Sequence, residues 1–296
     1  MSALICGSLA FDTITNFPGR FSQQILPDQV HILNVSFLVP TLRREFGGCA
    51  GNIAYSLAQL GGEPLVMATL GNDGHSYLDR IRSWGASTDY VRAVEESYTA
   101  QAIIITDTDN NQITAFHPGA MQHAHVTAVP NRKDIELAII APDGRDAMLQ
   151  HAQQLADARI PFIFDPGQGL PMFSGDELKD FIAKATWVAV NDYEAKMLCD
   201  RTGLTLESLS NSHLKGVIVT LGADGCDVWE QGKKTHVPGV KAEAVVDPTG
   251  CGDAFRAGVL KGLTTGAGLS DAAALGNGVG AKKIACRGGQ NHSLIG

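Results

Sequence analysis

The segment best suited to chemistry lies near the end of the chain and reads Asp247-Pro248-Thr249-Gly250-Cys251-Gly252-Asp253. Small residues at Gly250, Cys251 and Gly252 allow consecutive backbone N–H groups to turn toward one point, and the helical pattern that follows would aim its positive end there. Such donors can stabilise charge on a transferred phosphoryl group, and Asp253 could accept the proton of an attacking hydroxyl. An ordinary helix cap after a glycine turn explains the spacing equally well.

Two features upstream could bind a hydroxylated ligand. The segment Phe46-Gly47-Gly48-Cys49-Ala50-Gly51-Asn52 leads into a helical pattern. Its glycines allow a ligand to approach the backbone, and the Asn52 amide can both donate to and accept from sugar hydroxyls. Asp12 is a carboxylate just past an apolar run and could take two adjacent hydroxyls. A simple helix entry and a simple cap are the alternatives for these two features.

Two further segments follow strand-like runs. In Asn191-Asp192-Tyr193-Glu194 the first and last residues lie one helical turn apart and could hold waters around Mg²⁺. Taken alone, a capping arrangement is the simpler explanation. The glycines of Thr220-Leu221-Gly222-Ala223-Asp224-Gly225 could admit the ribose of a nucleotide, or they could form a tight hairpin turn. The chain has neither a Walker A sequence nor a dinucleotide fingerprint.

The elements that must position these residues alternate along the chain. Short, continuous apolar runs predict strands buried on both faces, with helical patterns between them. The strand-like runs cover 3–6, 65–70, 137–141, 162–164, 187–190 and 217–220. The helical patterns cover about 51–60, 76–84, 147–158, 176–185, 193–200, 253–264 and 271–286. This order predicts an α/β fold with a mostly parallel central sheet and helices on each side.

Two stretches, about 13–46 and 98–118, depart from this rhythm because they are richer in β-branched and aromatic residues. A turn-rich segment, 107–111, separates the strand-like runs 101–106 and 112–116, which predicts a hairpin. We expect both stretches to form one small β-sheet that projects from the main sheet as a candidate lid. Surface hairpins without a role in closure are the alternative.

The bulk composition narrows the class of protein. The 296 residues are 44% hydrophobic, which suffices for one large domain spanning 1–296. A net charge of -8 argues against a partner such as nucleic acid or an anionic membrane surface. The six cysteines form no Cys-x-x-Cys pair, so neither a disulfide framework nor a zinc site is indicated. Because no apolar stretch reaches the ~18 residues of a membrane helix, we expect a cytoplasmic protein.

Taken in order, these segments resemble the PfkB (ribokinase-like) carbohydrate kinase family along nearly the whole chain. Five motifs carry the resemblance: Gly7-Ser8 with Asp12, Gly47-Gly48-x-x-x-Asn52, Asn191-x-x-Glu194, Thr220-x-Gly222-x-x-Gly225 and the Asp247 to Asp253 segment. The resemblance implies a three-layer α/β/α fold with a β-lid and MgATP as the phosphate donor. It also implies that Asp253 is the base that activates the substrate hydroxyl.

The resemblance also implies roles for the other motif residues. The sugar hydroxyls would be held by Asp12, Gly48 and Asn52, with Ser8 in the same substrate site. Mg²⁺ would be organised through waters by Asn191 and Glu194. The anion hole would comprise Gly250, Cys251 and Gly252. The nucleotide would contact Asn191, Thr220, Gly222, Gly225 and Asn277.

Four stretches look most like bacterial adenosine kinases and related broad nucleoside kinases: 21–26, 35–39, 116–121 and 165–168. By that similarity Ser36, Phe37, Phe116 and Gln168 would line a base pocket. An aromatic residue suits that role because base stacking is worth about 1–3 kcal/mol and tolerates different bases.

Two positions depart from the family pattern, and one region is where the family often binds a monovalent cation in addition to Mg²⁺. Cys251 stands where alanine or glycine is usual, and Pro248 where threonine is usual. Asn277 and the turn 287–290 lie where the family binds adenine and often a monovalent cation, so a requirement for K⁺ is left open.

The leading expectation is a kinase that phosphorylates the 5′-hydroxyl of adenosine, with inosine and guanosine as further candidate substrates. A ribokinase- or fructokinase-type sugar kinase is the alternative within the same class. A non-catalytic ligand-binding protein of the same fold is the alternative outside it. A lid with exposed strand edges would also allow a homodimer through the lid.

Overall fold

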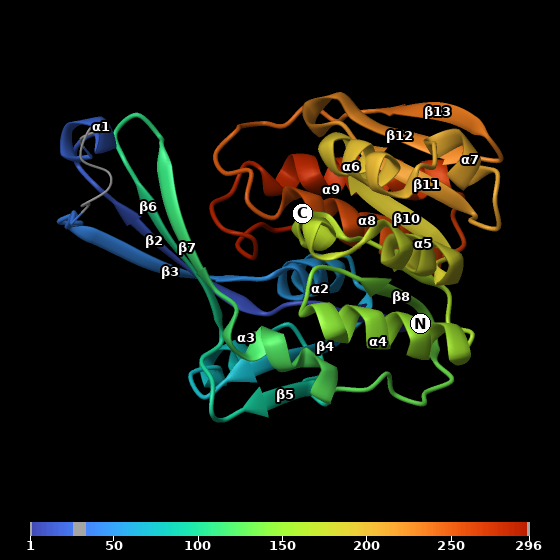
Figure 1. Cartoon of the computed structure of the whole chain (residues 1–296), viewed down its shortest axis with the longest axis horizontal. Coiled ribbons are helices and arrows are strands. Elements are labelled where there is room, and N and C mark those ends of the chain that lie inside the picture. The colour runs from blue at the N-terminus through green and yellow to red at the C-terminus, as the bar shows by residue number, and fades with distance from the viewer. Residues whose placement is uncertain (1, 26–33, 295–296) are drawn as a thin grey trace.

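Two β-sheets frame the molecule in this computed structural model, which describes residues 2–25 and 34–294 (Figure 1). Within the described residues the larger sheet has nine strands in the order β13-β12-β11-β10-β9-β8-β1-β4-β5. Their bounds are β1 Ser2–Cys6, β4 Glu63–Gly71, β5 Val91–Val94, β8 Ile135–Ile140, β9 Phe162–Phe164, β10 Trp187–Asn191, β11 Gly216–Thr220, β12 Gly225–Glu230 and β13 Lys233–Pro238. In this sheet every neighbouring pair from β5 across β4, β1, β8, β9 and β10 to β11 is parallel, whereas the pairs β11–β12 and β12–β13 are antiparallel.

Helices cover both faces of this sheet because its central strands are apolar on both sides. In β1, Ala3 and Ile5 belong to one core cluster, while Leu4 and Cys6 belong to the other. The helices that contribute to the first cluster are α2 Cys49–Gln59, α3 His75–Ser83, α8 Cys251–Thr264 and α9 Leu269–Lys283. Those that contribute to the second are α4 Arg145–Asp157, α5 Gly175–Lys184, α6 Asp192–Thr202 and α7 Leu206–Ser210. The predicted three-layer α/β/α architecture is therefore confirmed.

The sequence patterns missed the antiparallel edge of the sheet. Strand β13 is exposed at every position except Val237, so its residues form no apolar run. Strand β5 and helix α7 were also missed, because each has only four or five residues. No helix in the described part of the chain has the length and apolar character needed to cross a membrane.

The second sheet is the predicted lid, and Figure 1 shows it projecting from the main body. Its strand order is β3-β2-β6-β7, with bounds β2 Ala10–Asn16, β3 Thr41–Gly47, β6 Ala100–Thr106 and β7 Gln112–His117. Strands β2 and β6 pair in parallel, and the two outer pairs are antiparallel. The short helix α1, Phe21–Gln24, lies at the outer end of this sheet (Figure 1). Part of the predicted stretch 13–46, including Leu26, lies outside the described residues.

The predicted hairpin between β6 and β7 is confirmed, and its turn is held by one side chain. The Asp107 carboxylate accepts hydrogen bonds from the backbone N–H groups of Asp109 and Asn111, at 2.9 and 2.8 Å. It also accepts one from the Phe21 N–H at 3.0 Å, which fastens α1 to the hairpin. The turn residues that marked the hairpin in the sequence thus also fix the end of the lid.

Candidate active site

The candidate site forms where the carboxyl ends of the parallel strands meet the helix α2. The loop after β1 and the loop after β8 are joined by the Ser8 N–H, which donates to the Pro142 carbonyl at 3.1 Å. The Ser8 hydroxyl accepts from the Cys49 N–H at 3.2 Å, and the Ser8 carbonyl accepts from the Ala50 N–H at 3.0 Å. Ser8 therefore caps the N-terminus of α2 in this structure.

Gly48 is required at this junction because of a close backbone approach. Its φ of +85° lies in the region that side chains rarely adopt. A Cβ here would lie 2.6 Å from both the Ser8 carbonyl oxygen and the Ala10 nitrogen. The glycine lets α2 begin directly against the β1–β2 connection, which brings Asn52 into the site.

Asp253 lies in the first turn of α8 and is the carboxylate that the other site residues surround. The Asn52 amide donates from Nδ2 to its Oδ2 at 2.8 Å. Burial raises the pKa of Asp253 to about 6; the Asn52 hydrogen bond opposes this shift and the nearby Asp165 carboxylate adds to it. At neutral pH Asp253 is therefore ionised and still basic enough to take a proton from a hydroxyl group.

The loop before α8 turns as the glycines require, but not all of its N–H groups are free. Gly250, with φ of +77°, is the N-cap of α8. The Cys251 N–H donates to the Pro248 carbonyl at 3.1 Å. In the described part of the chain we find no acceptor for the N–H groups of Gly250 and Gly252. These two N–H groups, at the positive end of a 14-residue helix, are the available anion donors.

Asp247 begins this loop and fixes it to the end of the chain. Its carboxylate accepts from the Thr249 N–H at 2.9 Å and from the Gly288 N–H at 2.8 Å. Burial raises the pKa of Asp247, but these hydrogen bonds outweigh it and bring the pKa below its ordinary value. The first residue of the segment is therefore structural in this conformation.

An ion pair that the sequence patterns missed lies next to Asp253. Arg256 donates from Nε and Nη2 to the two carboxylate oxygens of Asp165, at 3.0 and 3.1 Å. Both side chains are buried, and fork-shaped pairing of this kind satisfies both charges. The signal in the sequence is an arginine inside the otherwise apolar pattern of α8, together with an aspartate directly after the buried strand β9.

Asn191 and Glu194 form a reciprocal capping box at the start of α6. The Asn191 Oδ1 accepts from the Glu194 N–H at 2.7 Å, and the Glu194 Oε2 accepts from the Asn191 N–H at 2.9 Å. Burial raises the pKa of Glu194; the Asn191 hydrogen bond opposes the shift and Asp165 adds to it. The capping interpretation is thus confirmed, and it leaves the second carboxylate oxygen, Oε1, outside the capping pair.

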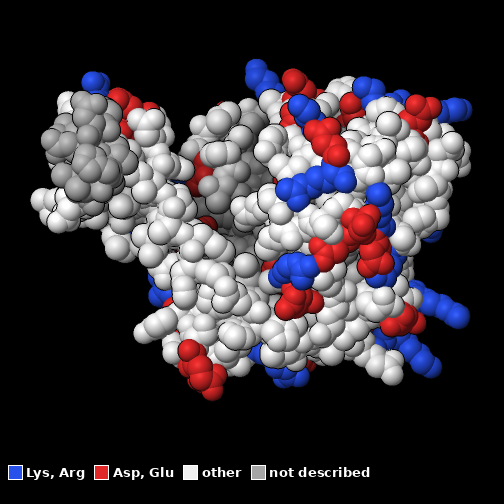
Figure 2. All heavy atoms as spheres, viewed as in Figure 1, with Lys and Arg blue, Asp and Glu red and all other residues white. Residues whose placement is uncertain are grey.

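Asp12 reaches the site from lid strand β2, where it lies opposite Glu45 of β3. Burial, the Asp247 carboxylate and the Glu45 carboxylate together raise the pKa of Asp12 to about 6. A Cβ on Gly47 would lie 2.5 Å from the Asp12 Oδ2, so the glycine provides room for this carboxylate. Figure 2 shows the surface hollowed between the lid and the main body, with acidic side chains at the wall.

The structure separates the residues predicted to form a base pocket. Phe116 is 51% exposed on β7, and the register Asp12–Ala102–Phe116 puts it on the same face of the lid as Asp12. Phe37 instead packs against Phe21 of α1, with ring centroids 5.1 Å apart, at the outer end of the lid. Ser36 and Gln168 are exposed. Of these four residues, Phe116 is the one that the strand register places on the Asp12 face.

The residues predicted to bind the nucleotide have structural roles of their own. Gly222 and Gly225 belong to the turn that joins the antiparallel strands β11 and β12, so the hairpin interpretation is confirmed. Thr220 ends β11 just before this turn. The Asn277 amide donates from α9 to the carbonyls of Val237 and Pro238, at 3.3 and 3.1 Å.

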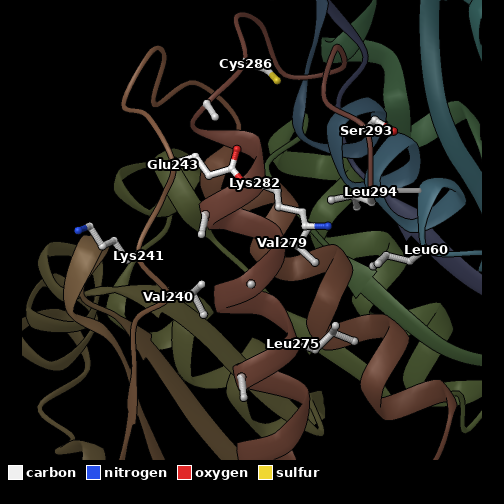
Figure 3. A pocket seen from close by; sticks show the side chains of 14 residues that line it. Leu60, Val240, Lys241, Glu243, Leu275, Val279, Lys282, Cys286, Ser293 and Leu294 are labelled. Atoms are coloured by element: carbon white, nitrogen blue, oxygen red, sulfur yellow. The ribbon is translucent and has the colours of Figure 1, made fainter. Parts of the chain in front are cut away.

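A cavity of about 680 Å³ lies along another part of α9. Figure 3 shows Val240 and Lys241 on one side of this helix and Leu60 and Leu294 on the other. None of the residues predicted to bind the nucleotide lines this cavity, although Asn277 belongs to the same helix. Its wall is mostly apolar, which suits a flat ring better than a phosphate group.

Gln290 ends the turn that the family resemblance associates with adenine and a monovalent cation, but here its side chain contacts Asn52 and Tyr77. Its Nε2 donates to the Asn52 Oδ1 at 3.2 Å and to the Tyr77 hydroxyl at 2.6 Å. The Tyr77 hydroxyl in turn donates to the Gly47 carbonyl at 2.5 Å. These contacts orient Asn52 so that its NH₂ group faces Asp253. A buried glutamine in a glycine-rich turn carries no sequence signal for such a role.

Comparison with known proteins agrees with this geometry. The family model described as pfkB family carbohydrate kinase matches residues 16–295. A nucleoside kinase of Methanocaldococcus jannaschii is 30% identical over 245 residues, which cover 82% of this chain and 80% of that protein. An aminoimidazole riboside kinase of Salmonella typhimurium is 26% identical over 277 residues, 85% of this chain and 86% of that protein.

Among the solved structures, nucleoside kinases also match this chain, and at higher sequence identity. The nucleoside kinase of Burkholderia thailandensis in complex with inosine is 52% identical, with a TM-score of 0.88, and the match covers 98% of this chain and 93% of that one. Its complex described as ADP-inosine is 53% identical, with a TM-score of 0.86 over 99% and 92% of the two chains. Fold, site and relatives agree, and the chain belongs to the pfkB family of carbohydrate kinases, which makes it a phosphotransferase.

Proposed function

We propose that this protein is an ATP-dependent nucleoside kinase that phosphorylates the 5′-hydroxyl of adenosine and also accepts inosine or guanosine. The observation that carries the proposal is Asp253, a half-buried carboxylate with a raised pKa that lies beside free backbone donors at the start of α8. Support for a nucleoside acceptor comes from the relatives, which include a nucleoside kinase solved in complex with inosine.

Each part of the site has a role in this reaction. The Asp253 carboxylate takes the proton from the attacking hydroxyl, and Asn52 keeps the carboxylate in place through Nδ2. The N–H groups of Gly250 and Gly252 stabilise the charge that develops on the transferred phosphoryl group. Asp12 binds the ribose hydroxyls from the lid, because its face of β2 looks toward the segment that contains Asp247.

Mg²⁺ fits this site when it is held through water. In the described residues no group of three or more acidic, histidine or cysteine side chains could ligate a metal ion directly. Glu194 presents Oε1 beyond its capping pair, and carboxylates with waters are the ligands that Mg²⁺ usually has beside nucleotide phosphates. The bound ion would neutralise phosphate charge, while Glu194 and Asn191 orient its water ligands.

The nucleotide and the base are assigned to opposite sides of the Asp253 carboxylate. ATP would lie along the ends of β10 and β11, close to Asn191, Thr220 and the Gly222–Gly225 turn, with Asn277 beyond them. The nucleoside base would stack on Phe116 when the lid closes, since an exposed aromatic ring on the Asp12 face has no protein partner of its own kind among the described rings. The chain would act as one domain, with the lid as an inserted part.

A substrate panel tests the proposal. Purified protein is incubated with MgATP and, separately, with adenosine, inosine, guanosine, ribose and fructose, and ADP release is measured. We expect turnover of the nucleosides with kcat/KM at least 10-fold above that of the free sugars, because a base adds stacking contacts. Turnover of ribose or fructose alone would identify a sugar kinase, and no turnover of any acceptor would favour a binding protein.

The outer face of the lid suggests a second copy of the chain as a partner. Leu42 and Ile113 are 68% and 39% exposed, and the register across β3, β2, β6 and β7 places them on the face opposite Asp12. An apolar sheet face of this kind is normally covered. A homodimer through the lid would cover it.

A further inference from the structure

Lys283 is a fully buried lysine in the last turn of α9, with 0% of its surface exposed. Its Nζ donates to the Asp247 carbonyl at 2.7 Å and to the Cys286 carbonyl at 3.1 Å. The reaction assigned above uses no lysine, and burying an ammonium group is costly unless it is paired. A buried ammonium group at this position therefore requires a structural or functional explanation.

The two carbonyls belong to the two segments that build the phosphate side of the site. Asp247 begins the loop that ends at Asp253, and Cys286 precedes the turn 287–290, whose Gln290 orients Asn52. The Ile284 carbonyl accepts from the Val246 and Asp247 N–H groups, at 2.9 and 3.1 Å, so the same segments also meet through the backbone. By binding the Asp247 carbonyl, Lys283 thus holds the first residue of the loop that ends at Asp253.

This arrangement does not fit a monovalent cation at the same place. Potassium sites in proteins are built from backbone carbonyl oxygens that replace the hydration shell of the ion. Here two such oxygens, next to the turn where the family resemblance places a cation, already accept from an ammonium group. A K⁺ ion beside Lys283 would meet a like charge and would have to compete for the same lone pairs.

We propose that Lys283 acts as a built-in cation: its ammonium group holds the Asp247 and Cys286 carbonyls, positions the anion loop, and makes phosphoryl transfer independent of potassium. The proposal rests on the kinase function proposed above. Lys283 is a positioning residue, because it contacts main-chain oxygens of the loop rather than the reacting groups. Its location at the carboxyl end of α9 also favours a positive charge through the helix dipole.

The first test uses the wild-type protein. Turnover of adenosine and the thermal unfolding midpoint are measured in tetramethylammonium chloride and in KCl at equal ionic strength. We expect both quantities to be the same in the two salts. Activation of several-fold by KCl, or a higher midpoint in KCl, would overturn the proposal because it would show that a cation site exists in spite of Lys283.

The second test removes the ammonium group in two ways. Lys283→Ala leaves room for an ion, whereas Lys283→Met fills the space with an apolar chain. We expect kcat to fall about 10-fold or more in both variants, since hydrogen bonds to a charged group are among the stronger ones, while KM for adenosine changes little. KCl or NH₄Cl should restore Lys283→Ala to within a few-fold of wild type and leave Lys283→Met unchanged.

The matched control is Lys261→Ala. Lys261, in the last turn of α8, also donates to a backbone carbonyl, that of Gly61 at 3.1 Å, but this contact lies outside the loop. The activity of Lys261→Ala should stay at the wild-type level in both salts. Equal rescue of Lys283→Ala and Lys283→Met, or rescue of neither, would reduce Lys283 to a structural lysine.

Thermal unfolding separates failure of this proposal from failure of the kinase assignment. KCl should raise the unfolding midpoint of Lys283→Ala but not those of wild type or Lys283→Met, whether or not any nucleoside is turned over. If this pattern holds without kinase activity, the function assigned above is wrong and the built-in cation stands. If Lys283→Ala does not fold, the wild-type salt comparison decides.

Discussion

At the residue scale, a few polar and charged side chains carry the separate functions of the site. Asp253 is the base candidate, Asn52 holds it at 2.8 Å, and the Asp165–Arg256 pair lies beneath it. Asn52, Asp165 and Arg256 are buried and Asp253 is half-buried, and a charge without a partner at such a position would be costly. The consequences of altering one of them therefore differ from those of altering a surface residue.

Replacing Asp253 by asparagine removes the base and keeps the shape of the side chain. Asp253→Asn should lower kcat at least ~10²-fold, which is typical for loss of a general base, and leave nucleoside binding intact. Steady-state kinetics and calorimetric titration with adenosine measure the two effects. Asp271→Asn, an exposed aspartate in the first turn of α9, is the matched control. Full activity of Asp253→Asn would remove this residue from the mechanism.

The raised pKa values predict how activity depends on pH. Asp253 and Asp12 both have pKa values of about 6, and the ionised form is the one that accepts a proton or binds hydroxyls. The value of kcat/KM should therefore be constant above pH 7 and fall below pH 6, with a steeper slope than one group would give. In Asp12→Asn the slope should decrease to that of a single ionisation. A flat profile between pH 5 and 8 would contradict both assignments.

The buried pair predicts an asymmetric effect on stability. Arg256→Met leaves the Asp165 carboxylate buried without its partner and should lower the free energy of unfolding by about 3–5 kcal/mol. The double variant Arg256→Met with Asp165→Leu removes both charges and should recover much of this loss. Urea unfolding measures both. Equal stability of the single and double variants would show that the ion pair is not coupled.

At the scale of elements, glycines decide where helices begin. Gly48 lets α2 start against the β1–β2 connection, and Gly250 does the same for α8. Because Asn52 and Asp253 each lie within the first turn or so of these helices, the hydrogen bond between them depends on both helix starts. Backbone geometry at two glycines thus controls a side-chain contact.

A comparison of two glycines with positive φ tests this dependence. Gly48→Ala would add a Cβ at 2.6 Å from two backbone atoms, whereas Gly61→Ala, with φ of +66°, meets nothing within 4 Å. Gly61→Ala should cost only the backbone strain, about 1–2 kcal/mol. Gly48→Ala should cost more and should also reduce kcat. Similar unfolding free energies for the two variants would show that the close approach at Gly48 relaxes easily.

At the scale of the whole molecule, the lid leaves an apolar face and strand edges exposed to solvent. Its strand β7 is exposed along its full length, and apolar side chains lie on its outer face. A covering partner would protect both the apolar face and the exposed strand edges.

The proposed homodimer can be tested on this face. We expect the wild-type protein to sediment as a dimer and Ile113→Asp to sediment as a monomer, because a buried carboxylate would be uncompensated in the interface. Val126→Asp changes an exposed apolar residue outside the lid and should leave the dimer intact. A wild-type monomer at micromolar concentration in sedimentation velocity would remove the lid interface.

The sequence by itself determined the alternation of the longer strands and helices, the lid hairpin and the motif that contains Asp253. These features depend on local patterns: apolar runs, helical periodicity and turn residues such as those after Asp107. It did not reveal β13, whose exposed residues form no apolar run, and it left the motifs at Asn191 and Gly222 open between structure and ligand binding.

The tertiary structure alone decided which side chains meet. Asn52 and Asp253 are 201 positions apart, and Arg256 and Asp165 are 91 apart. Gln290 and Lys283 join the site only because the end of the chain returns beside α2 and the loop before α8. Buried polar groups must find partners wherever the fold brings them, and no local pattern encodes a partner that distant in the chain. For this reason the motif was readable from the sequence, whereas the residues that hold it in place were not.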